Sequence, residues 1–146
     1  MKKNMKQTLT STVSVVLALV VLLCLSACGN TETQTGSWEH AVYLEDTELG
    51  TGEKTIFVEV QSKDKTVTFT IHTNQDTVGA ALLELELITG DEGAYGLYVK
   101  TVNGILADYD IDQSYWALYI NGEYAMTGVD TTEIAEGTTY RLAYAK

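Results

Sequence analysis

Tyrosine is concentrated in the last third of the chain, where its rings and hydroxyl groups could hold a ligand. Eight of the nine tyrosines and one of the two tryptophans lie between Tyr95 and Tyr144. Aromatic side chains offer a large contact area with few rotamers to lose, and the tyrosine hydroxyl adds a hydrogen-bonding group. This composition predicts a surface that binds a flat, partly polar ligand.

The same rings could instead pack inside the domain. Tyrosine and tryptophan favour strands for packing reasons. Trp116 alternates in step with Leu118 and Ile120, which favours a core position for its indole. Both roles stay open for Trp116, and also for Tyr98, Tyr115 and Tyr119.

Three aspartates, Asp108, Asp110 and Asp112, form a D-x-D-x-D run that resembles the start of a calcium-binding loop. No glycine follows Asp112, and Tyr119 stands where a bidentate glutamate would close the site. We therefore expect a solvated acidic loop and no metal site.

Catalytic signatures are missing from the sequence. His40 and His72 stand apart from each other, from any cysteine and from paired carboxylates, and His72 continues a solvent-facing row of threonines. No serine, cysteine or lysine has an evident activating partner, and no nucleotide-binding or hydrolase motif is present. We expect a protein that is not an enzyme.

The N-terminal segment has the features of an export signal. Three lysines precede an apolar run, residues 13–25, that is short for a membrane span, and Leu25-Ser26-Ala27-Cys28 follows. This pattern resembles a bacterial lipoprotein signal, which implies that residues 1–27 are removed and that Cys28 carries a lipid anchor outside the cytoplasm. The alternative is an ordinary signal peptide with an incidental cysteine.

The charge balance excludes some partners. After removal of residues 1–27, six basic residues face 20 acidic ones, a net charge of −14. Such a field repels nucleic-acid phosphates and anionic lipids, so we expect neither to be bound through charge. Loss of Cys24 and lipidation of Cys28 would leave no free thiol for redox chemistry or metal binding.

The remaining chain must position the aromatic residues. Residues 28–37 are small and polar, which predicts a flexible tether, and residues 38–52 are a poorly defined lead-in. Alternation over residues 55–61 and 66–72 predicts a hairpin with one apolar face. Apolar spacing from Val78 to Leu85 predicts a helix, with Asp76 or Thr77 as its cap and Gly90 as its stop.

Strands return after this helix. Residues 95–102 lead into Asn103-Gly104, residues 115–120 lead into Asn121-Gly122, and residues 138–145 alternate tyrosine and leucine with polar residues. Asn-Gly between apolar runs is typical of a tight hairpin turn. A hairpin, a helix and then several strands predict an α+β domain with a β-grasp-like sheet and one helix across one face.

Four segments, TVGAALLELELI, GLYVKTVNGI, YWALYINGEYAMTGVD and EGTTYRLAY, resemble a bacterial domain family related to the C-terminal β-domain of transcobalamin and intrinsic factor. The resemblance covers residues 53–146. It implies a soluble-ligand-binding β-grasp fold whose eukaryotic relatives close over one face of cobalamin. In those relatives a helical barrel forms the other half of the cleft, and this sequence shows no such segment.

The resemblance also implies which residues would face a ligand. The matching positions are Tyr95, Leu97, Tyr98, Asn103, Gly104, Ile105, Tyr115 and Trp116, and Tyr119 joins them as an aromatic neighbour. The expected function is capture of cobalamin or a related small molecule beside a membrane transporter. The alternative is a protein-interaction module that docks a partner through its aromatic strands.

Overall fold

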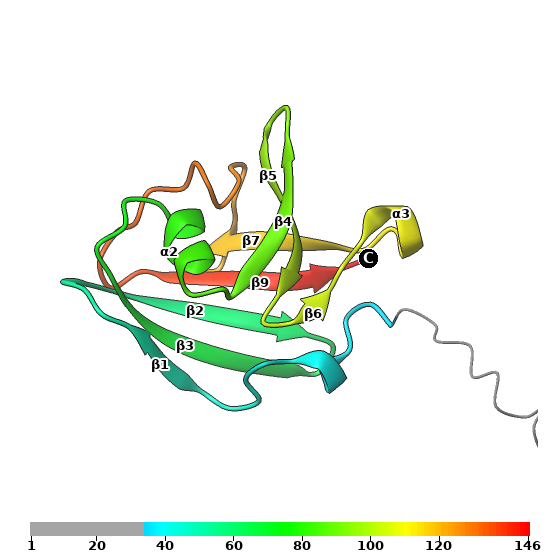
Figure 1. Cartoon of the computed structure of the whole chain (residues 1–146), viewed down its shortest axis with the longest axis horizontal. Helices are drawn as coiled ribbons and strands as arrows, with labels where there is room; N and C mark the ends of the chain where they lie inside the picture. Colours follow the sequence, from blue (N-terminus) through cyan, green and yellow to red (C-terminus); the bar gives the residue numbers. More distant parts are fainter. Residues whose placement is uncertain (1–33) are drawn as a thin grey trace, which may run out of the picture. The chain divides into compact units, whose positions relative to one another are not determined.

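Two strands with alternating apolar residues form the centre of a six-stranded sheet in the computed structural model, which describes residues 34–146 (Figure 1). Strands β2 (Lys54–Ser62) and β3 (Lys65–Thr73) pair antiparallel, with Val58 opposite Phe69. Their apolar side chains are fully buried on one face. The predicted hairpin is therefore confirmed.

The sheet has the strand order β1-β3-β2-β9-β7-β8. The added strands are β1 (Thr47–Gly50), β7 (Tyr115–Ile120), β8 (Glu123–Tyr124) and β9 (Thr139–Ala145). Strand β9 runs parallel to β2 and antiparallel to β7, while β7 and β8 form a hairpin around Asn121-Gly122. Asn121 has a φ of 49°, the left-handed conformation that such a turn requires.

The predicted helix is confirmed as α2 (Val78–Glu84). The Thr77 hydroxyl caps it by accepting from the Ala80 N–H, and Leu82 is among the side chains that it buries. The helix ends earlier than Gly90, because Glu86 adopts a φ of 54° and the chain then turns back. Gly90 lies in the following strand, where an added Cβ would stand 2.1 Å from the Tyr98 carbonyl oxygen.

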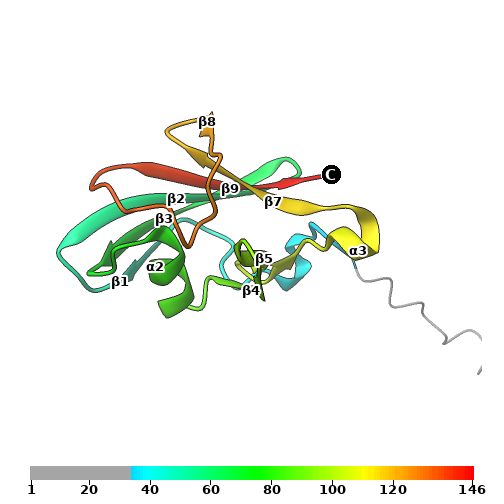
Figure 2. The ribbon, with the colours of Figure 1, turned by 90° about the horizontal axis from the view of Figure 1, so that it is seen from above.

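A second sheet, not predicted from the sequence, follows the helix. It consists of β4 (Ile88–Gly93), β5 (Gly96–Val102) and β6 (Ile105–Leu106). Figure 1 shows the β4–β5 hairpin crossing the larger sheet steeply, and Figure 2 shows that α2 and this hairpin lie on the same side of it. The core therefore lies between one face of the six-stranded sheet and a layer made of α2 and the small sheet. The α+β class is confirmed.

The lead-in belongs to the folded domain. The Trp38 indole, in the short 3-10 helix η1 (Trp38–His40), donates to the Ser62 carbonyl oxygen at 2.9 Å. The Ser62 hydroxyl donates to the Gly36 carbonyl oxygen at 2.8 Å. Residues 34–37, expected to be tether, are thus packed against the sheet, while the predicted signal, residues 1–27, and Cys28 lie outside the described residues. No helix within residues 34–146 is long and apolar enough to cross a bilayer.

The Asp112 carboxylate ties three segments together at one end of the domain. It lies in the short helix α3 (Tyr109–Asp112) and accepts hydrogen bonds from the hydroxyls of Ser114 and Thr35. The Lys146 ammonium group lies 2.9 Å away. These donors, the Ser114 hydroxyl first, hold the pKa of Asp112 well below its usual range.

This lowered pKa makes stability depend on pH. The contribution of Asp112 is complete above the ordinary carboxyl pKa of about 3.9 and is lost as the pH falls below it, toward the lower pKa of the folded state. We expect Asp112→Asn to be less stable than the wild type at neutral pH but to lose less stability on acidification. Denaturant melts across this pH range check the prediction, and the neighbouring Asp110→Asn should keep the wild-type slope. Equal slopes for the two variants would contradict it.

Candidate functional site

A pocket opens between β5, the edge of β7 and the loop that follows β8. Its cavity volume is about 160 Å³. The wall from β5 consists of Leu97, Tyr98 and Val99, and Tyr115 to Leu118 form the wall from β7. Five residues from the end of β8 and the next loop, Tyr124, Ala125, Thr127, Gly128 and Val129, line the remainder together with Leu142.

The pocket exists because β8 stops early. Strand β8 pairs only with Tyr119 and Ile120 of β7, and one more bond joins the Ala125 N–H to the Leu118 carbonyl oxygen at 2.9 Å. The chain then leaves the strand, so residues 115–117 face the pocket with no strand paired on that edge in the described part of the chain. A sheet edge of this kind presents backbone polar groups to an incoming ligand.

Four aromatic residues are among those that line the pocket. Tyr98, Tyr115 and Tyr124 are 40%, 37% and 55% exposed, whereas Trp116 is only 8% exposed. Because the pocket lies at the sheet edge, Trp116 reaches it from the core face of β7, and Tyr115 and Tyr124 belong to the opposite face. Trp116 also packs edge-on against Tyr144, with ring centroids 6.0 Å apart. Trp116 therefore packs in the core and also forms part of the pocket wall. The sequence had left core packing and ligand contact open as alternatives for this residue.

Two buried polar atoms near the pocket lack a partner among the described residues. One is the Trp116 indole nitrogen, and the other is Oδ1 of Asp130. The second oxygen of Asp130 accepts from the Leu97 N–H at 3.2 Å, so Asp130 fastens the base of the β4–β5 hairpin. Gly96 leaves room for this carboxylate, since an added Cβ would stand 2.2 Å from Oδ2.

The structure brings together Leu97, Tyr98, Tyr115 and Trp116 of the residues singled out in the sequence. Tyr119 points to the opposite face of the sheet, where its ring lies 4.9 Å from the Arg141 guanidinium group and 5.5 Å from the Tyr124 ring. Tyr119 is therefore the cross-strand neighbour of Tyr124 on the face opposite Trp116, and it does not line the cavity.

The remaining predicted positions have other surroundings. Tyr95, at the tip of the β4–β5 hairpin, is fully exposed. Asn103 and Ile105 are completely buried, and the Asn103 side chain bonds both the N–H and the carbonyl of Tyr43. Gly104 lies against the His40 carbonyl oxygen, 2.2 Å from where a Cβ would stand. We correct the sequence-based assignment for this turn from ligand contact to packing.

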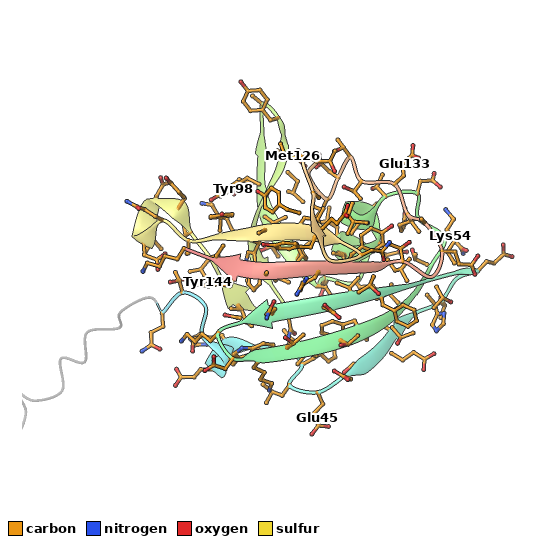
Figure 3. All side chains as sticks on the ribbon, turned by 180° about the vertical axis from the view of Figure 1, so that it is seen from behind. Glu45, Lys54, Tyr98, Met126, Glu133 and Tyr144 are labelled. Atoms are coloured by element: carbon orange, nitrogen blue, oxygen red, sulfur yellow. The ribbon has the colours of Figure 1, made fainter. Side chains whose placement is uncertain are left out.

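The loop residues Ala125, Thr127, Gly128 and Val129 were not singled out from the sequence. The Asn121-Gly122 turn held the relevant signal, because a two-residue hairpin returns the chain along the strand that precedes it. Residues a few positions after the turn must then face Trp116 and its neighbours. Figure 3 shows Met126, in this loop, and Tyr98 on the same side of β7.

The other candidate groups have structural partners. His72 lies between Thr55, 3.0 Å from its Nδ1, and Glu48, 2.7 Å from its Nε2, and so links β2, β3 and β1. Asp108 lies 3.3 Å from the Lys100 ammonium group and caps α3, while Asp112 bonds elsewhere. Within residues 34–146 no group of three or more His, Cys, Asp or Glu side chains is placed to hold a metal ion.

Comparison with known proteins places the chain in a family. Residues 75–146 match the family model described as a domain of unknown function, DUF4430. No curated protein matches the chain.

Two solved structures share the fold. A protein from Ruminococcus gnavus ATCC 29149, described as a candidate metal-binding protein, is 30% identical with a TM-score of 0.61; the match covers 64% of this chain and 98% of that one. Haptocorrin, solved in complex with Cbi, is 19% identical with a TM-score of 0.54, over 64% of this chain and 25% of haptocorrin. This chain thus corresponds to about a quarter of haptocorrin's length and shares its fold there. The chain belongs to the same family as the Ruminococcus gnavus protein, and its residues 75–146 match the DUF4430 model.

Proposed function

We propose that this protein is a membrane-anchored, extracytoplasmic lipoprotein that captures a small molecule in the pocket between β5 and β7. The observation that carries the proposal is a cavity at an unpaired part of a sheet edge, with Tyr98 and Trp116 among the residues that line it. Rings of this kind provide contact area with little entropy loss on binding. The lipidation of Cys28 would keep the pocket near the membrane, where a transporter could receive the ligand at high local concentration.

Cobalamin or a related molecule is the ligand that we propose first. Haptocorrin shares the fold of this domain and was solved in complex with Cbi. The cavity of about 160 Å³ is smaller than the roughly 300–1,000 Å³ typical of pockets for drug-sized ligands. A corrinoid would therefore place one projecting group in the pocket and rest its remaining surface on the exposed tyrosines.

Tryptophan fluorescence and calorimetry test this proposal. Trp38→Phe leaves Trp116, in the pocket wall, as the only tryptophan of the chain. With the full-length protein in a non-ionic detergent, we expect cobalamin to give saturable heat and a saturable change in Trp116 emission. Tyr98→Ala should weaken both, whereas Tyr109→Ala, an exposed tyrosine outside the pocket, should not. Absence of calorimetric heat at the highest soluble cobalamin concentration would remove cobalamin as the ligand.

Docking of a partner protein is the second candidate function. Tyr95 at the hairpin tip and Met126 in the loop after β8 are almost fully exposed, at 103% and 92%. Exposed aromatic and methionine side chains are enriched at protein interfaces. If this function holds, Tyr95→Ser should abolish capture of a partner such as the transporter and leave small-molecule binding unchanged.

A further inference from the structure

We propose that the free edge of β7 binds an extended peptide segment of a partner protein, which adds one strand to the six-stranded sheet and places one apolar side chain in the pocket. This inference rests on the proposed function only for the location of the site, the cavity between β5 and β7. It names a partner class, an extended polypeptide, that the capture of a small molecule does not require.

The first argument is the direction of the backbone groups in β7. Residues of an antiparallel strand turn their N–H and carbonyl groups alternately to one neighbouring strand and to the other. The Asn121 N–H bonds the Thr139 carbonyl oxygen at 2.8 Å on the β9 side, whereas the Leu118 carbonyl oxygen accepts from the Ala125 N–H on the opposite side. Trp116, two residues before Leu118, therefore turns both of its backbone groups to the edge that faces away from β9.

The backbone groups on this edge lack partners. Within residues 34–146, no hydrogen bond joins the Trp116 N–H, the Trp116 carbonyl oxygen or the Leu118 N–H to another backbone group on this side of β7. Both residues are nevertheless largely covered. A covered backbone group without a hydrogen bond is costly, so an incoming backbone that supplies the bond gains affinity.

The second argument is the β4–β5 hairpin, which forms a wall beside this edge. Figure 1 shows the hairpin projecting beyond β7, past the edge of the larger sheet. Leu97, Tyr98 and Val99 of β5 line the cavity together with Trp116 and Leu118. A strand added to β7 would therefore have β5 on its core side. Free sheet edges accept extended peptides, whose main chain supplies affinity and whose alternate side chains supply specificity.

The pocket selects the side chain that enters it. A residue directly opposite Trp116 in an antiparallel pair points to the same face as Trp116, which is the core face. The cavity of about 160 Å³ adjoins Trp116 on this face, and none of the residues that line it is acidic or basic. It therefore suits one apolar side chain of the size of leucine or phenylalanine.

The surroundings favour an isolated segment over the edge of a second sheet. The free stretch, residues 115–118, follows α3 and ends where Ala125 bonds Leu118, so a wide sheet would meet α3 and the loop after β8. Exposed carboxylates stand at the two ends, Asp110 in α3 and Glu123 in β8, and neither forms an ion pair within the described part of the chain. Basic residues on both sides of the apolar residue would complement them.

The test titrates a blocked heptapeptide, lysine-serine-threonine-leucine-threonine-serine-lysine, by calorimetry into the full-length protein in a non-ionic detergent. We expect the peptide to saturate one site and to bind about tenfold more weakly when alanine replaces the leucine. A second peptide, with phenylalanine in place of leucine, covers a pocket that prefers a ring. Absence of saturation by both peptides at about 1 mM would overturn the inference.

Methylation of the peptide backbone provides a matched control. In the antiparallel register, the leucine opposite Trp116 turns its N–H toward β7, and the threonine that follows turns its N–H away. Methylation of the leucine nitrogen should weaken binding more than about tenfold, whereas methylation of that threonine nitrogen should change it less than about threefold. Equal effects of the two methyl groups would overturn the inference, because the peptide would not be paired with β7.

Hydrogen exchange locates the added strand. In the free protein, we expect the amides of Trp116 and Leu118 to exchange faster than that of Ala117, which pairs with Ala143 of β9. Bound peptide should slow exchange at Trp116 and Leu118 and leave Ala117 unchanged. Unchanged exchange at Trp116 with saturating peptide would place the peptide elsewhere and contradict the inference.

The outcomes separate this inference from the proposed function. If cobalamin binds and neither peptide does, the peptide inference is wrong and the capture function stands. If a peptide binds with the expected methylation and exchange effects and cobalamin does not, the inference stands and cobalamin is not the ligand. If neither cobalamin nor a peptide binds, both proposals are wrong.

Discussion

Replacing Asn103 with alanine is expected to lower the free energy of unfolding by about 3 kcal/mol without acting directly on the pocket. The Asn103 side chain is completely buried, accepts from the Tyr43 N–H at 2.9 Å and donates to the Tyr43 carbonyl oxygen at 2.8 Å. Alanine would leave both buried backbone groups unpaired. It would also be placed at a φ of 50°, a conformation that asparagine tolerates better than alanine.

Asn121→Ala is the matched control for this prediction. Asn121 occupies the same position of the other Asn-Gly turn and has nearly the same φ, 49°, but it is exposed and its side chain only accepts from the Thr139 N–H at 3.2 Å. We expect a cost of about 1 kcal/mol there. Denaturant unfolding compares the two variants. Equal losses would show that Asn103 does not anchor the lead-in segment, and lost ligand binding with unchanged stability would restore Asn103 as a ligand contact.

Filling the pocket is expected to abolish ligand binding. Ala125 lines the cavity and fixes the loop through its backbone N–H, which bonds the Leu118 carbonyl oxygen whatever the side chain is. In Ala125→Phe a phenyl ring would take up much of the cavity of about 160 Å³. We expect the affinity for cobalamin to fall more than tenfold, which corresponds to more than about 1.4 kcal/mol.

Met126→Phe controls for the added ring, because Met126 is the next residue, is 92% exposed and does not line the pocket. Calorimetry gives the affinities, and denaturant unfolding shows whether the larger side chain strains the core, for which overpacking costs about 1–3 kcal/mol. Unchanged affinity in folded Ala125→Phe would place the ligand elsewhere on the domain.

The parts of the fold that the sequence predicted are those set by local pattern. Alternation specified β2 and β3, the spacing of Val78, Ala81 and Leu82 specified α2, and Asn-Gly marked two hairpin turns. Strand β4 was not predicted, because its sequence, ITGDEG, has no apolar alternation and only its pairing with β5 holds it extended. No local sequence pattern indicates the parallel pairing of β1 with β3 either, because it joins residues that are distant in the sequence.

The residues of the candidate site also differ in whether a local sequence pattern or a distant contact places them. Residues on regular strands, such as Tyr98 and Trp116, could be assigned to a shared region, and the structure places both on one cavity. The turn at Asn103 could not be assigned correctly, since its partner Tyr43 is 60 residues away and its burial is set by that contact. Asp130 gave no signal in the sequence, because its importance comes from contacts with Gly96 and Leu97 that only the folded chain creates.

The indole N–H signals of the two tryptophans test the location of the binding site most directly. In a proton–nitrogen correlation NMR spectrum, we expect added cobalamin to shift the Trp116 signal saturably. The Trp38 signal, whose N–H is bonded to the Ser62 carbonyl oxygen at 2.9 Å, should stay in place. A saturable shift of Trp38 with Trp116 unmoved, or no shift of either signal at concentrations where calorimetry shows binding, would contradict a ligand site between β5 and β7.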